Sequence, residues 1–125
     1  MISIVEDDAA VREATKLLIR SLGYTAATFA SAEEFLHSNH VDGTSCLITD
    51  IQLPGITGVE LQEKLVAEGH RIPIIFITAF PHEHMRTRVL KAGAIAFLRK
   101  PFTDDSLIGY LDKALEDFRS GTAER

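Results

Sequence analysis

Short apolar runs alternate along this chain with segments of helical periodicity. The runs that are typical of strands cover residues 2–5, 24–29, 46–49, 72–78 and 94–98. Between and after these runs, apolar residues recur with the spacing of one face of an α-helix. This spacing predicts helices between Asp8 and Gly23, after Ser31, over 58–67, over 81–92, and from residue 103 or 104 to 118.

The type of sheet follows from the strands themselves. Their apolar runs are nearly continuous, as in the segment 72–78 (IPIIFIT), and show little polar–apolar alternation. Such runs are typical of strands that are buried on both faces of a parallel sheet. Strands that alternate with helices favour the same arrangement. The sequence therefore predicts an α/β domain whose sheet is covered by helices on both faces.

Residues that favour the start of a helix support these predicted helix boundaries. Asp8 precedes the first helix and can cap its free N–H groups. Ser31 and Glu34 have the spacing of a capping box, in which each side chain bonds the other's backbone. Thr103 or Asp104 is expected to cap the last helix. These signals agree with the apolar spacing.

Length and composition indicate one soluble domain. The chain has 125 residues, of which 46% are hydrophobic and 25% charged, and both values are ordinary for a globular protein. The last six residues are small or polar and carry no packing signal. The predicted domain therefore spans residues 1–119, and residues 120–125 are expected to be a flexible tail or the start of a linker to an output domain that is not in this chain.

Charge and cysteine content narrow the classes of function. The net charge of −5 offers no basic stripe that could neutralise nucleic-acid phosphates. The one cysteine, Cys46, cannot form an internal disulfide and lies in an apolar run, which favours a reducing, cytoplasmic compartment. No apolar run has the length of a membrane span, and the N-terminus does not resemble a signal peptide.

The informative chemistry lies where the predicted strands end. Glu6 and Asp7 follow the first strand, Asp50 the third, Thr78 ends the fourth, and Lys100 follows the fifth. In an open parallel sheet the carboxyl ends of the strands lie side by side, and ligands bind there. Three carboxylates, a hydroxyl and an ammonium are therefore expected at one edge of the fold.

This set of groups suits phosphoryl chemistry. Oxygen ligands without histidine or cysteine favour Mg²⁺, which binds carboxylates together with substrate phosphate. Lys100 and Thr78 can hold phosphoryl oxygens. A carboxylate can also attack phosphorus and form an aspartyl phosphate. We therefore interpret Asp50 as a nucleophile whose charge is balanced by Mg²⁺ and Lys100.

Each of these residues also has an ordinary interpretation. Asp50 alone is more often a turn residue or a cap, and Thr78 alone is an ordinary β-branched strand residue. Glu6 and Asp7 could belong to a solvated loop, and Lys100 could be a surface lysine. Four such coincidences at four strand ends are harder to explain by chance than a common site.

At this point the sequence closely resembles the receiver domain of two-component response regulators. The resemblance covers essentially the whole chain and rests on segments that read IVEDD (4–8), TDIQLPGITG (49–58), FITA (76–79) and KAGAIAFLRKPF (91–102). The segments LPGITG and AFLRKPF are most similar to the FixJ-like group of receivers. The resemblance implies a flavodoxin-like (CheY-like), doubly wound sheet of five parallel strands in the order 2-1-3-4-5, with five helices.

The resemblance also implies roles for the residues at the strand ends. Asp50 would accept a phosphoryl group from a sensor histidine kinase. Asp7, Asp50 and the backbone carbonyl of Gln52 would hold Mg²⁺, and Glu6 would assist through water. Thr78 and Lys100 would bind the phosphoryl oxygens. The domain would catalyse only its own phosphorylation and dephosphorylation, so no conventional enzyme activity is expected.

A switch is implied as well. The Lys100–Pro101 peptide is expected to be cis, and Phe97 occupies the aromatic switch position of the family. Phosphorylation would draw the Thr78 hydroxyl inward, and Phe97 would follow. The face formed by the fourth helix, the fifth strand and the fifth helix would then change shape, and in this family it often forms a homodimer.

Several further side chains are candidates for that signalling face, namely Phe80, His82, Met85, Phe97 and Arg99. Met85 and Phe97 could equally pack beneath the fourth helix. Phe80 is bulky and apolar, as is Leu53 near the acceptor. We hypothesise that Phe80 covers the site and slows hydrolysis by excluding water.

Other functions remain open at this point. A Mg²⁺-dependent phosphohydrolase that forms an aspartyl phosphate generally needs a second acid two residues after its nucleophile, and that position is Gln52. A flavin or nucleotide binder would need a phosphate-binding loop, which the glycines do not form. The receiver could stand alone, or it could control a DNA-binding transcriptional domain beyond these residues.

Overall fold

Strands and helices alternate along the whole described chain. The computed structural model describes the backbone of residues 1–123 and, within the last helix, the side chains as far as residue 116. The strands are β1 (Ile2–Val5), β2 (Ala26–Phe29), β3 (Cys46–Asp50), β4 (Ile74–Thr78) and β5 (Ala96–Arg99). The helices are α1 (Ala9–Ser21), α2 (Ala32–Leu36), α3 (Gly58–Ala67), α4 (Glu83–Lys91) and α5 (Asp104–Ala123). Among the described residues, none of these helices has the length and apolar character that a bilayer crossing requires.

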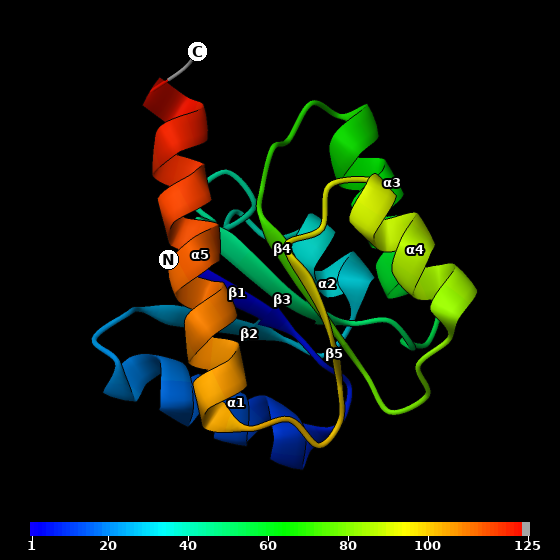
Figure 1. Ribbon diagram of the computed structural model, residues 1–125, viewed down its shortest axis with the longest axis horizontal. Helices are drawn as coiled ribbons and strands as arrows, with labels where there is room; N and C mark the ends of the chain where they lie inside the picture. Colours follow the sequence, from blue (N-terminus) through cyan, green and yellow to red (C-terminus); the bar gives the residue numbers. More distant parts are fainter. Residues whose placement is uncertain (124–125) are drawn as a thin grey trace.

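The five strands form one parallel sheet in the order β2-β1-β3-β4-β5. This order confirms the predicted flavodoxin-like, doubly wound fold. Helices α1 and α5 cover one face of the sheet, and α2, α3 and α4 cover the other (Figure 1). The strand order reverses between β1 and β3, which is where ligands bind in open α/β sheets.

Two hydrophobic cores, one on each face, hold the layers together. Successive residues of a strand point to opposite faces, so each strand contributes to both cores. Ile48 of β3 packs with Ile19 of α1 and Leu107 of α5. Leu47 of the same strand packs with residues of α2 and α3 on the other face. Both faces of the central strands are therefore apolar, as their continuous apolar runs predicted.

Cys46 is part of the core on the α1–α5 face. The residue is fully buried, and burial raises the pKa of its thiol to about 12. A thiol is a nucleophile only as the thiolate, so this cysteine is a small packing residue.

The observed elements differ from the predicted ones mainly at their ends. Strand β3 includes Asp50, which the sequence placed just after the strand, and β5 runs from Ala96 to Arg99. Helix α5 continues to Ala123, so its backbone is helical over the first part of the predicted tail. The small and polar residues at the end of α5 lack the apolar spacing from which a helix is predicted, but most of them can still adopt a helical backbone. The remainder of that predicted tail, residues 124–125, lies outside the described residues.

The helix caps confirm two predictions and correct one. Asp8 Oδ1 accepts hydrogen bonds from the N–H groups of Ala10 at 2.9 Å and Val11 at 3.2 Å. Thr103 Oγ1 accepts one from Ser106 N at 3.1 Å, at the start of α5. The predicted capping box of α2 is only half formed, because Ser31 accepts from Glu34 N without a return bond.

A complete capping box lies instead at α3, where the sequence analysis did not predict one. Thr57 Oγ1 accepts from Glu60 N at 3.2 Å, and Glu60 Oε1 accepts from Thr57 N at 3.0 Å. The next residue, Gly58, donates a hydrogen bond from its N–H to Ile51 O at 2.8 Å. The start of α3 is therefore fixed directly against the end of β3, which carries Asp50.

We predict that Gly58→Ala strongly destabilises the protein. A Cβ at this position would overlap the Asp50 carbonyl oxygen and lie 2.9 Å from Ile51 Cα, and both contacts are with backbone that cannot rotate away. Overpacking of this kind costs about 1–3 kcal/mol or more. Gly109→Ala in α5 is the control, because a Cβ there meets nothing within 4 Å. Chemical denaturation should show a loss for Gly58→Ala and no loss for Gly109→Ala, and equal stabilities would contradict the steric account.

Candidate functional site

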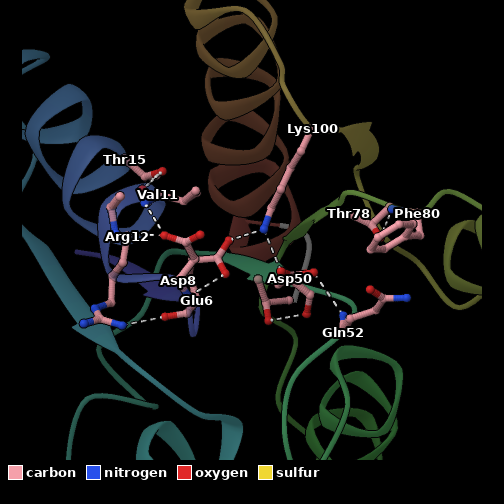
Figure 2. A network of polar contacts seen from close by, with 12 residues as sticks. Glu6, Asp8, Val11, Arg12, Thr15, Asp50, Gln52, Thr78, Phe80 and Lys100 are labelled. Atoms are coloured by element: carbon pink, nitrogen blue, oxygen red, sulfur yellow. Dashed lines mark hydrogen bonds and ion pairs between the residues drawn. The ribbon is translucent and has the colours of Figure 1, made fainter.

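The register of the sheet brings the predicted site residues together. Val5 of β1 pairs with Thr49 of β3, so Glu6 follows its strand beside Asp50. Thr78 of β4 pairs with Arg99 of β5, so Lys100 comes directly after the pairing. Figure 2 shows the side chains of Glu6, Asp50 and Lys100 converging at this edge of the sheet.

Three carboxylates form the centre of the site. Glu6, Asp7 and Asp50 each offer an oxygen within 4.8 Å of the others. Glu6 is fully buried and Asp50 is 5% exposed, whereas Asp7 is exposed. Buried like charges repel one another strongly because little solvent screens them. The cluster therefore requires a cation or protons for compensation.

Lys100 supplies one compensating charge. Its ammonium donates a hydrogen bond to Asp50 Oδ2 at 2.7 Å. It also lies 2.5 Å from Glu6 Oε1 as an ion pair. Lys100 is therefore shared between the two buried acids, and its single charge faces three carboxylates.

The pKa values reflect this balance. Burial raises the pKa of Glu6 from its ordinary 4.5 to about 7, and the Lys100 ammonium and the Asp8 N–H offset the rise only in part. Burial alone would lower the pKa of Lys100, but the bonds to Asp50 and Glu6 outweigh it and raise that pKa. Lys100 therefore stays charged at neutral pH, while Glu6 takes up a proton readily.

Backbone contacts orient the acids. Gln52 N donates to Asp50 Oδ1 at 3.0 Å, so each oxygen of Asp50 has one donor. Asp8 N donates to Glu6 Oε2 at 3.1 Å. Arg12 of α1 donates from its guanidinium to the Glu6 carbonyl at 2.9 Å and ties the acidic turn to the helix (Figure 2). The sequence analysis missed Arg12, because no local pattern connects it to Glu6.

The predicted hydroxyl belongs to Thr78, the last residue of β4, and among the described residues it makes no hydrogen bond to the acidic cluster. Thr78 is 1% exposed, and its Oγ1 accepts a hydrogen bond from Phe80 N at 3.1 Å. Lys100 N donates to the Thr78 carbonyl at 2.7 Å, which connects the ends of β4 and β5. The Lys100–Pro101 peptide is cis, as predicted. Pro101 itself is exposed.

The candidates for the signalling face divide into two groups. Phe97 and Met85 are partly buried and pack against the core on the α2–α4 face, so their packing interpretation is the one the structure supports. His82 and Arg99 are exposed. Phe80 is 67% exposed, and its side chain lies beside Thr78 in Figure 2. That Phe80 covers the site stays a hypothesis.

The residues present fit a hard divalent cation. The site offers only oxygen ligands from carboxylates, which suits Mg²⁺ rather than zinc. One oxygen of each of the three acids lies within 4.8 Å of the others, and the exposed Asp7 leaves the cluster accessible from solvent. Within the described residues, this is the one group of three or more potential metal-ligating side chains that lie close enough to share an ion.

The sheet order and this cluster at its carboxyl edge define the CheY-like receivers, a class of signalling domain. The chain belongs to the response regulator receiver domain family, whose family model matches residues 2–112.

Relatives and solved structures agree with this assignment. Nodulation protein W from Bradyrhizobium diazoefficiens is 41% identical over 116 residues, which are 93% of this chain and 51% of that protein. The response regulator StyR has a TM-score of 0.92 at 40% identity, covering 99% of this chain and 63% of that one. The crystal structure of FixJ-N has a TM-score of 0.81 at 32% identity and covers 92% of both chains, which confirms the FixJ-like resemblance. The chain spans about half the length of the curated relatives it matches.

We predict that Glu6 makes the stability of the metal-free protein depend on pH. The carboxyl titrates near 4.5 when unfolded and near 7 when folded, so the folded state holds the proton more tightly. The free energy of unfolding should therefore fall as pH rises from about 4.5 to about 7, by about 1.4 kcal/mol per unit of pKa difference. Urea denaturation with a chelator present should show this fall in wild type and a flatter curve in Glu6→Gln. Parallel curves would contradict the assignment.

Proposed function

We propose that this domain is a phosphorylation-controlled switch in which Asp50 accepts a phosphoryl group from a sensor histidine kinase in a Mg²⁺-dependent reaction. The observation that carries the proposal is the Asp50 carboxylate, which lies 2.7 Å from the Lys100 ammonium within a cluster of three acids. A carboxylate held this way is available as a nucleophile and is surrounded by groups that can neutralise an incoming phosphoryl group.

The transfer requires mainly positioning and charge neutralisation. An Asp50 carboxylate oxygen attacks phosphorus, the bond from phosphorus to the donor breaks, and the donor leaves with that bonding pair. Glu6, Asp7, Asp50 and the backbone carbonyl of Gln52 would hold Mg²⁺, which supplies positive charge to the phosphoryl oxygens. Lys100 then exchanges its contact with Asp50 for a contact with a phosphoryl oxygen.

Phosphorylation would act as a switch by shifting a population of conformations. Thr78 Oγ1 now accepts from Phe80 N, and its hydroxyl proton is free to be donated to a phosphoryl oxygen. A conformation in which Thr78 makes that bond becomes favoured once Asp50 is phosphorylated. Phe97 is only partly buried beside β4 and can follow, which would change the surface of α4, β5 and α5.

The surroundings of Lys100 offer a partner protein a place to approach. A cavity of about 530 Å³ adjoins Lys100 between α1 and the segment after β5, and its lining includes Leu18, Pro101 and Phe102. Such an apolar surface beside the acceptor suits the transient docking of a kinase.

The output is proposed from the relatives. Several of them are named as response regulators or transcriptional regulatory proteins and are about twice as long as the matched region. We infer that this receiver controls a transcriptional output domain in the cytoplasm, that DNA is reached only through that domain, and that phosphorylation favours a homodimer through the α4–β5–α5 face. A stand-alone receiver is the alternative.

A phosphohydrolase remains the less favoured function. Gln52 stands where such an enzyme would have its proton donor, and its backbone N–H is already engaged with Asp50 Oδ1. We therefore expect self-catalysed phosphotransfer and autodephosphorylation, without turnover of a separate substrate.

We predict that acetyl phosphate and Mg²⁺ add one phosphoryl group to the wild-type protein and none to Asp50→Asn. The amide of the variant is a far weaker nucleophile than a carboxylate. Intact-mass analysis measures the adduct directly. Asp112→Asn is the matched control, because Asp112 is exposed on α5 and should leave phosphorylation unchanged.

A wild-type protein without an adduct would be tested further with beryllofluoride, which mimics the aspartyl phosphate. Binding of beryllofluoride would show an intact site with a short-lived phosphoryl group. Failure to bind it would contradict the phosphoacceptor proposal.

The water-exclusion hypothesis for Phe80 makes a separate prediction. Phe80→Ala should hydrolyse the aspartyl phosphate faster than wild type if the ring moves over the site once Asp50 is phosphorylated, because excluding water slows hydrolysis. Val66→Ala is the control, since Val66 is similarly exposed at 58% but lies on α3. Decay of the phosphorylated mass with time measures both rates, and an unchanged rate in Phe80→Ala would refute the hypothesis.

A further inference from the structure

A side chain from α2 reaches the loop that follows Asp50. This loop, residues 51–57, joins β3 to α3 and contains Gln52. Glu33 in the first turn of α2 accepts a hydrogen bond at its Oε2 from Ile56 N at 3.3 Å. Its other oxygen, Oε1, is buried and has no hydrogen-bond partner among the described residues.

The contact between Glu33 and the loop is close. Gly55 has a φ of +76°, which already disfavours side chains. A Cβ at Gly55 would also overlap the Glu33 carboxylate, lying 3.2 Å from its Cδ. The carboxylate therefore packs directly on the backbone of the loop, at a position where the sequence supplies a glycine.

The other anchors of the loop are backbone contacts with β4 at its first residue, where Ile51 N donates to Ile77 O at 3.0 Å, and contacts within β3 and α3. Gln52 N bonds Asp50, Thr57 is held by the capping box of α3, and Gly58 N bonds Ile51 O. Among the hydrogen bonds of the described residues, the bond from Ile56 to Glu33 is the one that connects this loop's backbone to a side chain of another element.

The helix that carries Glu33 is anchored in the hydrophobic core. Near Glu33, Ala32 and Phe35 are fully buried, and the ring of Phe35 packs edge-on against Phe29 at 5.3 Å. The neighbours of Glu33 thus anchor the backbone of α2 to the core, while the half-buried Glu33 side chain reaches the loop.

Stability alone does not account for this carboxylate. A buried acid oxygen without a donor is unfavourable, and an apolar side chain of the same length, such as Met, would avoid that penalty but would leave Ile56 N without its acceptor. The geometry assigns Glu33 a positional role: we propose that Glu33 is a positioning residue that holds the β3–α3 loop, and with it the Gln52 carbonyl, in the arrangement that binds Mg²⁺. This inference rests on the metal site of the proposed function and deepens it.

The test measures binding of Mg²⁺ alone by calorimetric titration of the full chain. Glu33→Met keeps the length of the side chain but removes the acceptor, and its Kd for Mg²⁺ should rise on the order of tenfold, as for residues that support metal ligands. Glu33→Gln keeps an oxygen acceptor for Ile56 N and should bind Mg²⁺ about as tightly as wild type.

Glu34→Met is the matched control. Glu34 lies in the same first turn of α2 but is exposed, so this change removes an equal charge from the helix N-terminus without touching the loop. Hydrogen exchange of the Ile56 amide gives a second readout and should be faster in Glu33→Met alone. If circular dichroism shows that Glu33→Met is unfolded, Glu33→Ala takes its place.

The outcomes separate this inference from the proposed function. A wild type that binds no Mg²⁺ would overturn the metal site and the role of Glu33 together. Unchanged affinity in Glu33→Met, with wild type binding normally, would overturn only the role of Glu33. Equal weakening in Glu34→Met or in Glu33→Gln would show that charge rather than the hydrogen bond matters, and would also overturn it.

Discussion

The contact of Lys100 with Asp50 and Glu6 is the interaction on which the site depends. Parallel strands bring the ends of β1, β3 and β5 to one edge, so the acids that follow β1 and end β3 meet at short range. Without a nearby cation, two buried carboxylates would repel each other or take up protons. Lys100 reduces this repulsion because it directly follows β5 and its ammonium lies 2.7 Å from Asp50 Oδ2. Its own position is fixed by the bond from its N–H to the Thr78 carbonyl.

The sequence predicted the parts of the structure that follow from strong periodicity. The continuous apolar runs 46–49 and 72–78 predicted central strands of a parallel sheet, and every residue of β3 and β4 is buried in the structure. A parallel sheet places Asp50, Glu6 and Lys100 at the same edge, and the strand order that the resemblance implied places β1 next to β3. The site was therefore predictable from the residue types at the strand ends, although each residue taken alone has an ordinary interpretation.

Contacts between distant side chains could not be predicted in this way. The bond from Arg12 to the Glu6 carbonyl and the contact of Glu33 with Ile56 each depend on how two elements pack, and no local pattern encodes that distance. The capping box at Thr57 had the right spacing, but the Ser31 segment carries the same pattern and forms only half of it. The position of the Phe80 ring, which is 67% exposed, depends on the conformation of the loop after β4, and residue type alone does not predict that conformation.

The charge balance of the cluster explains why a divalent cation suits it. Three ionised carboxylates and one ammonium sum to −2, which a single Mg²⁺ would neutralise. In the metal-free state the same imbalance is relieved by protons, because burial raises the pKa of Glu6 to about 7. Protons and a metal ion would therefore compete for the cluster near neutral pH. Holding the acids together lowers the free energy of unfolding of the metal-free protein, and a bound cation would raise it again. The burial and mutual repulsion that make the empty cluster unfavourable would thus favour the binding of a cation.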